Sequence, residues 1–518
     1  MSKSLDERLT ECFQPETIKA AFLSYEEQKK DFFQEQNEPK IQMGADGISY
    51  KTFKNELDLR CKFISKRLLK GTYQFYPFRE VDIPKPPDGK RTLSISTIRD
   101  ALVQKLLYEA IYNEVEKDFK ATRTLDKVSC AYRKGKSAPY AAIQIHRYIK
   151  QGFKFALDAD IVKFFDTIPH QRLISLVENK FGKDTLATKL LRCFIKTGGV
   201  PYRNERGKPR YQLLFHRYKP NKKNIYRNQG IPQGGVLSGM LANLYLHEFD
   251  CWVLKDLSKK YSLRYVRYAD DFVILLKQKE LIDLVRIEVA EKLKEIELEL
   301  HTSESKTKCV DIANDSLEFV GFQFTLAHIR VKEANINRFQ KRILEKIKKE
   351  SNYKTGEKPE HRFNFFIKNV INRKVIGRGE TICSKCGGVI GERVKSWMGF
   401  FLIVTDIQQL RELDKWIRRE ISKHFYNNYQ LRLKKSSFKQ AELITLEKEY
   451  YRLHKRKICK CNESSCSLTS TSKDEVTEQN QNHSIFIEYN GSSLETIKKT
   501  TLCHYLLTVL KKIFMPFL

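Results

Sequence analysis

The sequence predicts a mixed α+β protein in which short antiparallel strands alternate with long amphipathic helices. Within 264–276, two runs rich in β-branched and aromatic residues flank an Ala-Asp-Asp turn, a pattern typical of a β-hairpin. Apolar residues recur at helical spacing over 98–115 and again over 281–296. With 518 residues, 41% of them hydrophobic, the chain is long enough for about three domains with buried cores.

The charge balance indicates a polyanionic partner. The chain has 95 Lys and Arg against 63 Asp and Glu, a formal net charge of +32. Such an excess creates a surface potential that attracts nucleic acid or an acidic membrane surface. The alternative is a set of solvated lysine faces without a partner. The 41% hydrophobic and 11% aromatic content excludes a disordered or fibrous chain.

The compartment is expected to be cytoplasmic, without a membrane partner. The opening MSKSLDERLT is polar where a secretory signal has its apolar core. The longest apolar run, 502–510, is about half of the roughly 18 residues that a membrane span needs. The 12 cysteines are scattered rather than arranged as a disulfide framework, so we expect most of them to be reduced thiols.

The N-terminal third is expected to contain helices and one pair of strands. Helical patterns cover 16–36 and begin again at 46–57, after an Asp-Gly turn. The Pro-rich segment 83–90 excludes a helix, and its Asp-Gly pair favours a tight turn between two short strands. A clear amphipathic helix follows over 98–115.

The middle of the chain combines a strand that carries acids with a basic segment. Apolar residues alternate at the start of 153–166, which places Asp158 and Asp160 together on the other face of that strand. The run 196–228 carries ten Lys and Arg, with tyrosines interleaved. Cations for phosphates and rings for unstacked bases suit a track for a nucleic-acid backbone.

The second half continues the alternation and then changes character. We expect one strand over 317–324, basic helices over 330–378 and further helices over 396–401 and 407–425. From about residue 456, Ser, Thr, Asn and Gln dominate and indicate a flexible linker. A short apolar helix is expected at the end, over 494–514.

The acidic residues at the strand ends are the candidate reactive groups. Asp160 closes one strand, and Asp270 and Asp271 form the tip of the hairpin. If the strands are neighbours, these carboxylates lie within roughly 10 Å of one another and need a cation to offset their repulsion. Oxygen ligands of this kind select Mg²⁺ or Mn²⁺. In isolation, an Asp-Asp pair is more often a turn or capping feature.

Six further motifs occur along the chain in a fixed order. They are IPKPPDGKRTLSI (83–95), FALDADIVKFFDTIPH (155–170), NQGIPQGGVLSGMLANLYL (228–246), RYADDFVILL (267–276), ESKTKCV (304–310) and LEFVGF (317–322). With these motifs the sequence resembles reverse transcriptases, most closely those of group II introns and their bacterial relatives, from about residue 45 to 325 and more weakly at 396–401. This resemblance implies a right-hand polymerase with fingers, an antiparallel palm sheet packed on helices, a helical thumb and a C-terminal tail.

The resemblance also implies a division of the chain. An N-terminal helical extension would cover 1–45, and fingers and palm would cover 46–325. A helical thumb with a Cys-x-x-Cys insertion would follow over 326–455, and a flexible linker with the C-terminal helix would cover 456–518.

Carried over to this sequence, the family's catalytic roles fall on the acidic residues. Asp160 and Asp270 match the carboxylates that bridge two Mg²⁺ ions, for which Mn²⁺ can substitute, and the Ile161 carbonyl is a further ligand. Asp271 matches the third aspartate, nearer the primer end. Phe165, five residues after Asp160, matches the aromatic residue under the sugar of the incoming nucleotide, where a ring collides with a 2′-hydroxyl and selects dNTPs. A core aromatic is the alternative for Phe165.

Other matches concern nucleotide and primer. Gln233 matches the residue that packs under the nucleotide and the template base. Lys85 and Arg91 match cations that grip the triphosphate, although Lys85 also suits a solvated surface. Lys306 matches a lysine that could protonate the leaving pyrophosphate, with Lys308 as the competing candidate. The primer grip would contain Phe319 and Gly321, residues that also suit any buried strand.

A second metal is suggested by Cys383 and Cys386, which have the spacing of half a zinc knuckle. Cys459, Cys461 and Cys466 are candidates for the missing half, but their separation from Cys386 is poor for such a site. The alternative is a pair of unmetallated thiols in a thumb insertion.

The resemblance implies an RNA-directed DNA polymerase whose partners are an RNA template, the DNA product and dNTPs. The forms RTLSIST and VLSGMLAN depart from group II introns, and HNH and retron signatures are not found. These features favour a stand-alone bacterial enzyme of antiviral defence with a dedicated non-coding RNA, and a homo-oligomer through 494–514 fits such a role. The alternatives are a group II intron reverse transcriptase or maturase, an untemplated or protein-primed transferase, and a non-catalytic RNA-binding scaffold.

Overall fold

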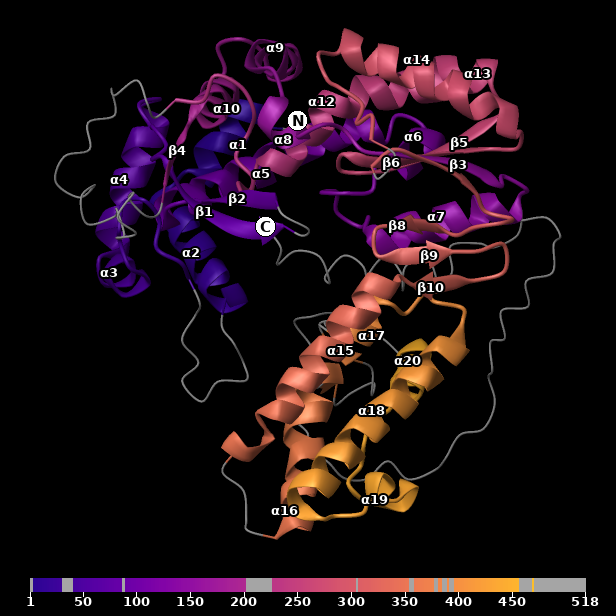
Figure 1. Cartoon of the computed structure of the whole chain (residues 1–518). Helices are drawn as coiled ribbons and strands as arrows, with labels where there is room; N and C mark the ends of the chain where they lie inside the picture. The colour runs from indigo at the N-terminus through magenta and orange to yellow at the C-terminus, as the bar shows by residue number, and fades with distance from the viewer. Residues whose placement is uncertain are drawn as a thin grey trace. The chain divides into compact units, whose positions relative to one another are not determined.

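The protein is described by a computed structural model, which divides into two compact units (Figure 1). Among the residues that the structure describes, the first unit contains those up to Arg133 and Arg147–Leu317, and the second contains Lys134–His146 and those from Glu318 onward. We describe each unit by itself. The structure describes residues 3–29, 41–85, 89–201, 226–303, 306–353, 358–376, 381–383, 389–390, 396–455 and 468–469.

The first unit begins with two helices that pack on later ones. Helices α1 (Leu5–Cys12) and α2 (Pro15–Lys29) lie against α5 (Ile98–Phe119), and α2 also contacts α4 (Leu57–Leu69). Ser4 caps α1 in a capping box with Glu7. Phe22 of α2 is fully buried and stacks on Phe53 at 5.3 Å. The N-terminal helices are therefore part of the core of this unit.

The predicted pair of strands on either side of the Pro-rich segment is confirmed. Strands β1 (Phe78–Lys85) and β2 (Gly89–Ile95) pair antiparallel, with Lys85 opposite Gly89, and β4 (Gly199–Pro201) joins β1 in parallel. Thr97 caps α5, the helix predicted over 98–115. Short helices complete this region: α3 (Tyr50–Asn55), α6 (Arg123–Val128), α8 (Phe164–Thr167), α9 (His170–Phe181) and α10 (Leu186–Lys196). Helix α7 (Ala138–Lys150) crosses from the second unit to the first.

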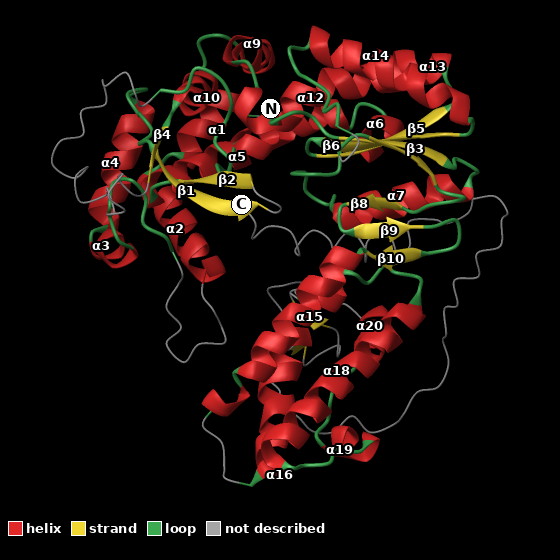
Figure 2. Cartoon of the chain, in the orientation of Figure 1, coloured by secondary structure: helices red, strands yellow, loops and turns green. Residues whose placement is uncertain are grey.

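A four-stranded sheet carries the acidic strand and the hairpin (Figure 2). Its order is β5-β6-β3-β7, with every neighbouring pair antiparallel. Helix α14 packs on β3, and α6 packs on β5. The elements are β3 (Phe155–Ala159), β5 (Leu263–Tyr268), β6 (Asp271–Leu276), β7 (Lys308–Asp311), η3 (Lys279–Leu281) and α14 (Ile282–Glu295).

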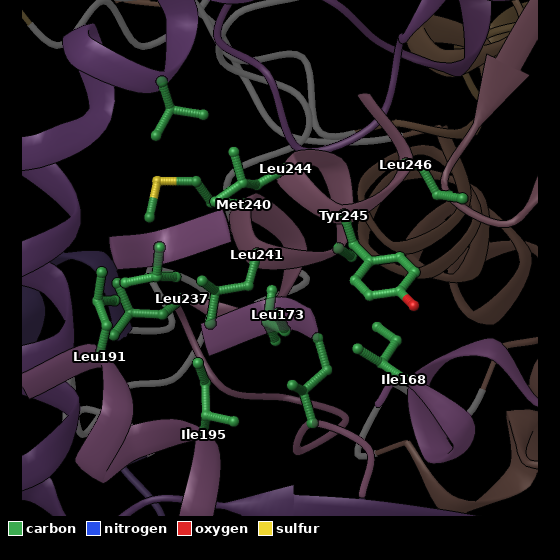
Figure 3. Packing of buried hydrophobic residues seen from close by; sticks show 14 of the residues in the cluster. Ile168, Leu173, Leu191, Ile195, Leu237, Met240, Leu241, Leu244, Tyr245 and Leu246 are labelled. Atoms are coloured by element: carbon green, nitrogen blue, oxygen red, sulfur yellow. The ribbon is translucent and has the colours of Figure 1, made fainter. Parts of the chain in front are cut away.

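The core of the first unit forms around α12 (Ser238–Trp252), which continues into the π-helix η2 (Val253–Leu257) and α13 (Ser258–Lys260). Apolar side chains of α12 interdigitate with those of α9 and α10 (Figure 3). The buried Tyr245 hydroxyl donates to the Ile296 carbonyl at 2.6 Å, so its polar atom is satisfied. Each buried leucine of this cluster contributes roughly 1.5–3 kcal/mol, which holds α12 firmly beside the sheet.

One prediction about the second unit is wrong. Residues 317–324 are not one strand but two, β8 (Leu317–Phe319) and β9 (Phe322–Phe324), in a sheet with β10 (Ile329–Val331). Val320 and Gly321 have φ angles of 43° and 91°, which reverse the chain between them. The sequence pattern does not show this turn, because Val320 is apolar and typical of a strand interior.

Helices dominate the rest of the second unit, as predicted. Trp397 packs on Phe339 at 4.5 Å, and Phe400 stacks on Phe322 at 5.6 Å, so α17 joins the long helices to the small sheet. The helices are α15 (Glu333–Lys348), η4 (Glu350–Asn352), α16 (Pro359–Phe365), the π-helix η5 (Phe366–Ile376), α17 (Trp397–Phe400), α18 (Ile407–Tyr429), α19 (Lys435–Gln440) and α20 (Leu446–His454). A further sheet contains β11 (Thr381–Cys383), β12 (Val389–Ile390) and β13 (Leu468–Thr469).

Several expectations lie outside the described residues. These are residues 30–36 of the first predicted helix, the turn at 86–88, most of the basic run 196–228, Cys386, and the tail 456–518 apart from β13. Among the described helices, none combines the length and the apolar character that crossing a bilayer requires.

Candidate active site

Strand pairing brings the predicted carboxylates together. In the β3–β6 ladder Ala159 lies opposite Phe272, so Asp160, the next residue, comes level with Asp271 at the start of β6. Opposite residues of an antiparallel pair have Cα atoms about 5 Å apart. Strand pairing therefore places Asp160 and Asp271 side by side. Asp158 shares the face of Asp160, because side chains alternate along a strand.

The hairpin tip is a strained two-residue loop. Tyr268 pairs with Asp271, which leaves Ala269 and Asp270 as the loop residues. Ala269 has a φ of 62°, and Asp270 is not among the residues with positive φ. A positive φ at the first loop position only is typical of a type II′ turn, which matches the twist of the flanking strands. An alanine in this conformation costs about 1–2 kcal/mol.

Arg267 stabilises this strained loop by a hydrogen bond to its backbone. Its Nη1 donates to the Ala269 carbonyl at 2.9 Å, and its guanidinium forms an ion pair with Asp250 of α12 in which both side chains are 0% exposed. Nη1 and Nη2 also bind Asn243 and Ser129, each at 3.0 Å. The sequence analysis missed this network. Its signal was an arginine at an inward position of the strand 263–268.

The site carries an excess of negative charge. Burial, together with the neighbouring charges of Asp270, Asp160 and Asp158, raises the pKa of Asp271 to about 8. Lys306 opposes this repulsion, with its Nζ 2.9 Å from Asp160 Oδ2. Its own pKa is raised, mainly by that hydrogen bond. Lys308, the competing candidate, lies in β7 opposite Asp158.

These groups fit divalent cations by their chemistry. Crowded carboxylates with a raised pKa are stabilised by a nearby positive charge, and hard oxygen donors prefer Mg²⁺. The Ile161 carbonyl is a suitable further donor. Its bridge to Leu300 is held by hydrogen bonds of the flanking residues, Val162 N to Glu299 O and His301 N to Asp160 O, each 2.9 Å. Within the described residues, however, no three His, Cys, Asp or Glu side chains are already assembled as a metal cage.

Phe165 and Tyr132 form an aromatic pair near the acidic residues. Phe165 is 9% exposed, and its ring lies 6.2 Å from that of Tyr132 in an edge-on arrangement. Burial raises the pKa of Tyr132 to about 12, with Asp270 adding to the effect and Arg91 opposing it. A Cβ on Gly239 would lie 2.3 Å from Tyr132 Cγ, so only glycine leaves room for this ring. The sequence analysis did not single out Tyr132.

Gln233 connects two other predicted regions. Its carbonyl accepts from Ser94 N at 2.7 Å, which fastens the 230–235 turn to β2. Its side-chain Oε1 accepts from Arg91 Nε at 2.8 Å, and its Nε2 donates to Asp166 Oδ1 at 3.1 Å. Arg91 and Gln233, predicted separately as nucleotide-binding residues, are thus in direct contact.

The other predicted site residues are Lys85, the two primer-grip residues and the two cysteines. Lys85 ends β1, but its side chain is outside the described part. Phe319 is buried in β8, and Gly321 forms the turn after it; both belong to the second unit. Cys383 lies in β11, and its predicted zinc partner Cys386 is outside the described residues.

Comparison with known proteins finds a family model that covers this site. Residues 83–324 match the family model described as reverse transcriptase (RNA-dependent DNA polymerase). That segment contains the acidic strand, the hairpin, Arg91 and Gln233. Residues 83–324 therefore match a reverse transcriptase domain, the catalytic domain of RNA-directed DNA polymerases. The predicted α+β class, with an antiparallel sheet packed on helices, is confirmed.

Individual relatives come from introns and bacteria. The chain is 26% identical to Protein YkfC of Escherichia coli, over 57% of this chain and 78% of the relative. It is 33% identical to the group II intron-encoded protein LtrA of Lactococcus lactis, over 41% of this chain and 30% of the relative. An uncharacterised 91 kDa protein in a cob intron of Schizosaccharomyces pombe is 34% identical, over 36% of this chain and 20% of the relative. The chain thus spans a third or less of the two intron proteins.

The solved structures that match the chain are more distant. Telomerase from Candida albicans with a fragment of telomeric RNA is 12% identical over 76% of this chain and 61% of that one, with a TM-score of 0.40. A partial Cas6-RT-Cas1–Cas2 complex is 21% identical over 56% of this chain and 41% of that one, with a TM-score of 0.29.

Proposed function

We propose that this protein synthesises DNA from dNTPs on an RNA template. The observation that carries the proposal is the meeting of Asp160, Asp270 and Asp271 at one edge of the sheet, inside a reverse transcriptase domain. A non-catalytic RNA-binding scaffold has no need of such a cluster, which costs stability unless a cation offsets it.

Each residue has a role in this proposal. Asp160, Asp270, Asp271 and the Ile161 carbonyl would hold two Mg²⁺ ions, or Mn²⁺, which when bound supply Lewis acidity for phosphoryl transfer. Lys306, at 2.9 Å from Asp160, balances the acidic cluster and can give a proton to the leaving pyrophosphate.

The nucleotide would meet a second group of side chains. Arg91 and Lys85 would bind the triphosphate, and Gln233 would support the nucleotide and template base. Phe165 would exclude a 2′-hydroxyl, and its low exposure of 9% means that its ring is held firmly in place. Phe319 and Gly321 would contact the primer.

A primer-extension assay tests the proposal. The full chain is incubated with an RNA template, a DNA primer, Mg²⁺ and either dNTPs or NTPs. We expect dNTP incorporation by the wild type and a loss of roughly 10³-fold in Asp270→Asn, because several kcal/mol of transition-state stabilisation disappear. Asp184→Asn, which removes an equal charge at an exposed site, is the control. Equal incorporation by Asp270→Asn would exclude the catalytic assignment.

The same assay separates an RNA polymerase or an untemplated transferase from the proposed enzyme. A reverse transcriptase prefers dNTPs and copies the template sequence, whereas a transferase extends the primer without regard to the template. Phe165→Ala is expected to accept NTPs, because the ring no longer meets the 2′-hydroxyl. Unchanged discrimination in this variant would make Phe165 a core residue only.

We further propose a stand-alone bacterial enzyme that copies a dedicated non-coding RNA in antiviral defence, as the sequence departures favour. Sequencing the nucleic acid that copurifies with the protein is expected to yield one abundant RNA, and phage plating is expected to show protection that Asp270→Asn lacks. Recovery of a spliced group II intron would favour the maturase alternative instead.

A further inference from the structure

Gln233 is held at both ends of its side-chain amide. Oε1 accepts from Arg91 Nε at 2.8 Å, while Nε2 donates to Asp166 Oδ1 at 3.1 Å. Arg91 comes from β2, Gln233 from the turn before α12 and Asp166 from α8. These three residues, separated by 142 and 67 positions in the sequence, form one chain of hydrogen bonds.

Asp166 and Arg91 favour the same orientation of the Gln233 amide. A carboxylate can only accept, so Asp166 requires the NH₂ end of the amide, and a guanidinium only donates, so Arg91 requires Oε1. Without Asp166 the single hydrogen bond to Arg91 has to hold the amide. Asp166 therefore supplies the second bond that fixes the one orientation of Gln233 that binds Arg91.

The backbone around Asp166 is well anchored. Asp166 N donates to Lys163 O at 2.7 Å, and Ile231 N donates to Phe165 O at 2.7 Å. A Cβ on Gly230 would lie 2.6 Å from Asp166 O, so the two segments touch closely. Asp166 and Gln233 thus keep a fixed separation, although the Asp166 side chain itself is exposed.

This geometry prepares Arg91 for an anion. Among the described residues, the Arg91 side chain makes one hydrogen bond, through Nε. The bond fixes the plane of the guanidinium while its Nη groups stay available for phosphate oxygens.

We propose that Asp166 is a positioning residue for the incoming dNTP: it orients the Gln233 amide and, through it, presents Arg91 to the triphosphate. This inference rests on the proposed function. Asp166 touches no reacting atom and acts only through Gln233.

A simple charge effect predicts the opposite change in the KM for dNTPs. An exposed carboxylate near a triphosphate repels it, so removing Asp166 would then lower the KM for dNTPs. If Asp166 instead orients Gln233, its removal raises KM. The sign of the change in KM therefore distinguishes the two explanations.

Steady-state dNTP incorporation by the full chain provides the test. We expect Asp166→Ala to raise the KM for dNTPs about fivefold, the loss typical of one hydrogen bond, with kcat changed less than about twofold. Asp166→Asn retains an oxygen that accepts from Nε2 and should restore the wild-type KM. In a Gln233→Ala background, Asp166→Ala should have no further effect. Asp184→Ala, an exposed site of equal charge, should leave KM unchanged.

The outcomes separate this inference from the proposed function. If the wild type incorporates dNTPs but Asp166→Ala lowers KM or leaves it unchanged, the positioning role is overturned alone. A full effect of Asp166→Ala in the Gln233→Ala background also overturns it. If the wild type incorporates no dNTP on any template, the proposed function falls, and the inference with it. Equal melting temperatures of Asp166→Ala and wild type confirm that the exposed substitution leaves the fold intact.

Discussion

Replacing Arg267 by methionine should destabilise the first unit strongly. The substitution keeps an unbranched side chain but removes a guanidinium that is 0% exposed. Asp250, also 0% exposed, would keep its charge and lose its ion pair, although the Tyr265 hydroxyl still donates to it at 2.9 Å. Breaking a buried pair in this way costs about 3–5 kcal/mol.

Two further variants make this prediction specific. Asp250→Asn, added to Arg267→Met, removes the unpaired charge, so the double variant should be more stable than Arg267→Met alone. Arg286 forms the control pair with Asp283 on the surface, where the side chains are 47% and 74% exposed, and Arg286→Met should cost less than about 1 kcal/mol.

Urea unfolding of the full chain measures these differences as shifts of the midpoint at a constant slope. A loss below about 1 kcal/mol in Arg267→Met would refute the reasoning, since it would mean that the buried charge of Asp250 carries no penalty. A further loss on adding Asp250→Asn would refute it as well. The same variant removes the hydrogen bond to Ala269 O, so DNA synthesis should also decrease.

Three other perturbations have expected outcomes. Ala269→Gly should raise the stability of the first unit by up to about 1 kcal/mol in urea unfolding, because glycine adopts a φ of 62° without steric cost; a loss of stability would contradict the strained turn. Gly239→Ala should displace the Tyr132 ring and reduce DNA synthesis in primer extension, whereas wild-type activity would show that the ring has room. Burial raises the pKa of Asp414 to about 6 in the folded chain, so the second unit should lose about 3 kcal/mol as the pH rises from about 4 to 6, the range where the unfolded carboxyl is ionised and the folded one is not. Asp414→Asn should flatten this pH dependence of urea unfolding, and an unchanged pH profile would contradict it.

Much of the site could be predicted because it follows from local pattern. Alternation in 153–166 placed Asp158 and Asp160 on one face, and the hairpin pattern placed Asp270 and Asp271 at its tip. The strands that carry these residues proved to be neighbours in one sheet. Reactive residues at the ends of strands can be predicted from the periodicity of the sequence, because the periodicity shows where the strands end and which face each residue is on.

The interactions that support the site could not be predicted in this way. Arg267 binds Ser129 across 138 positions, and a pattern of polar and apolar residues does not reveal which buried polar groups are partners. Val320 in the left-handed region gave no signal either, because valine is typical of strands and not of turns. Such features depend on tertiary contacts that select one conformation against local preference.

Binding of Mn²⁺ to the full chain, measured by electron paramagnetic resonance with Mg²⁺ as competitor, tests the central claim most directly. The acidic cluster of Asp160, Asp270 and Asp271 should bind Mn²⁺ in the wild type and in Asp184→Asn. In Asp270→Asn the affinity should fall at least about tenfold, since a charged ligand is lost. Equal Mn²⁺ affinity in Asp270→Asn and wild type would contradict the claim that these carboxylates together form the metal-binding centre of the enzyme.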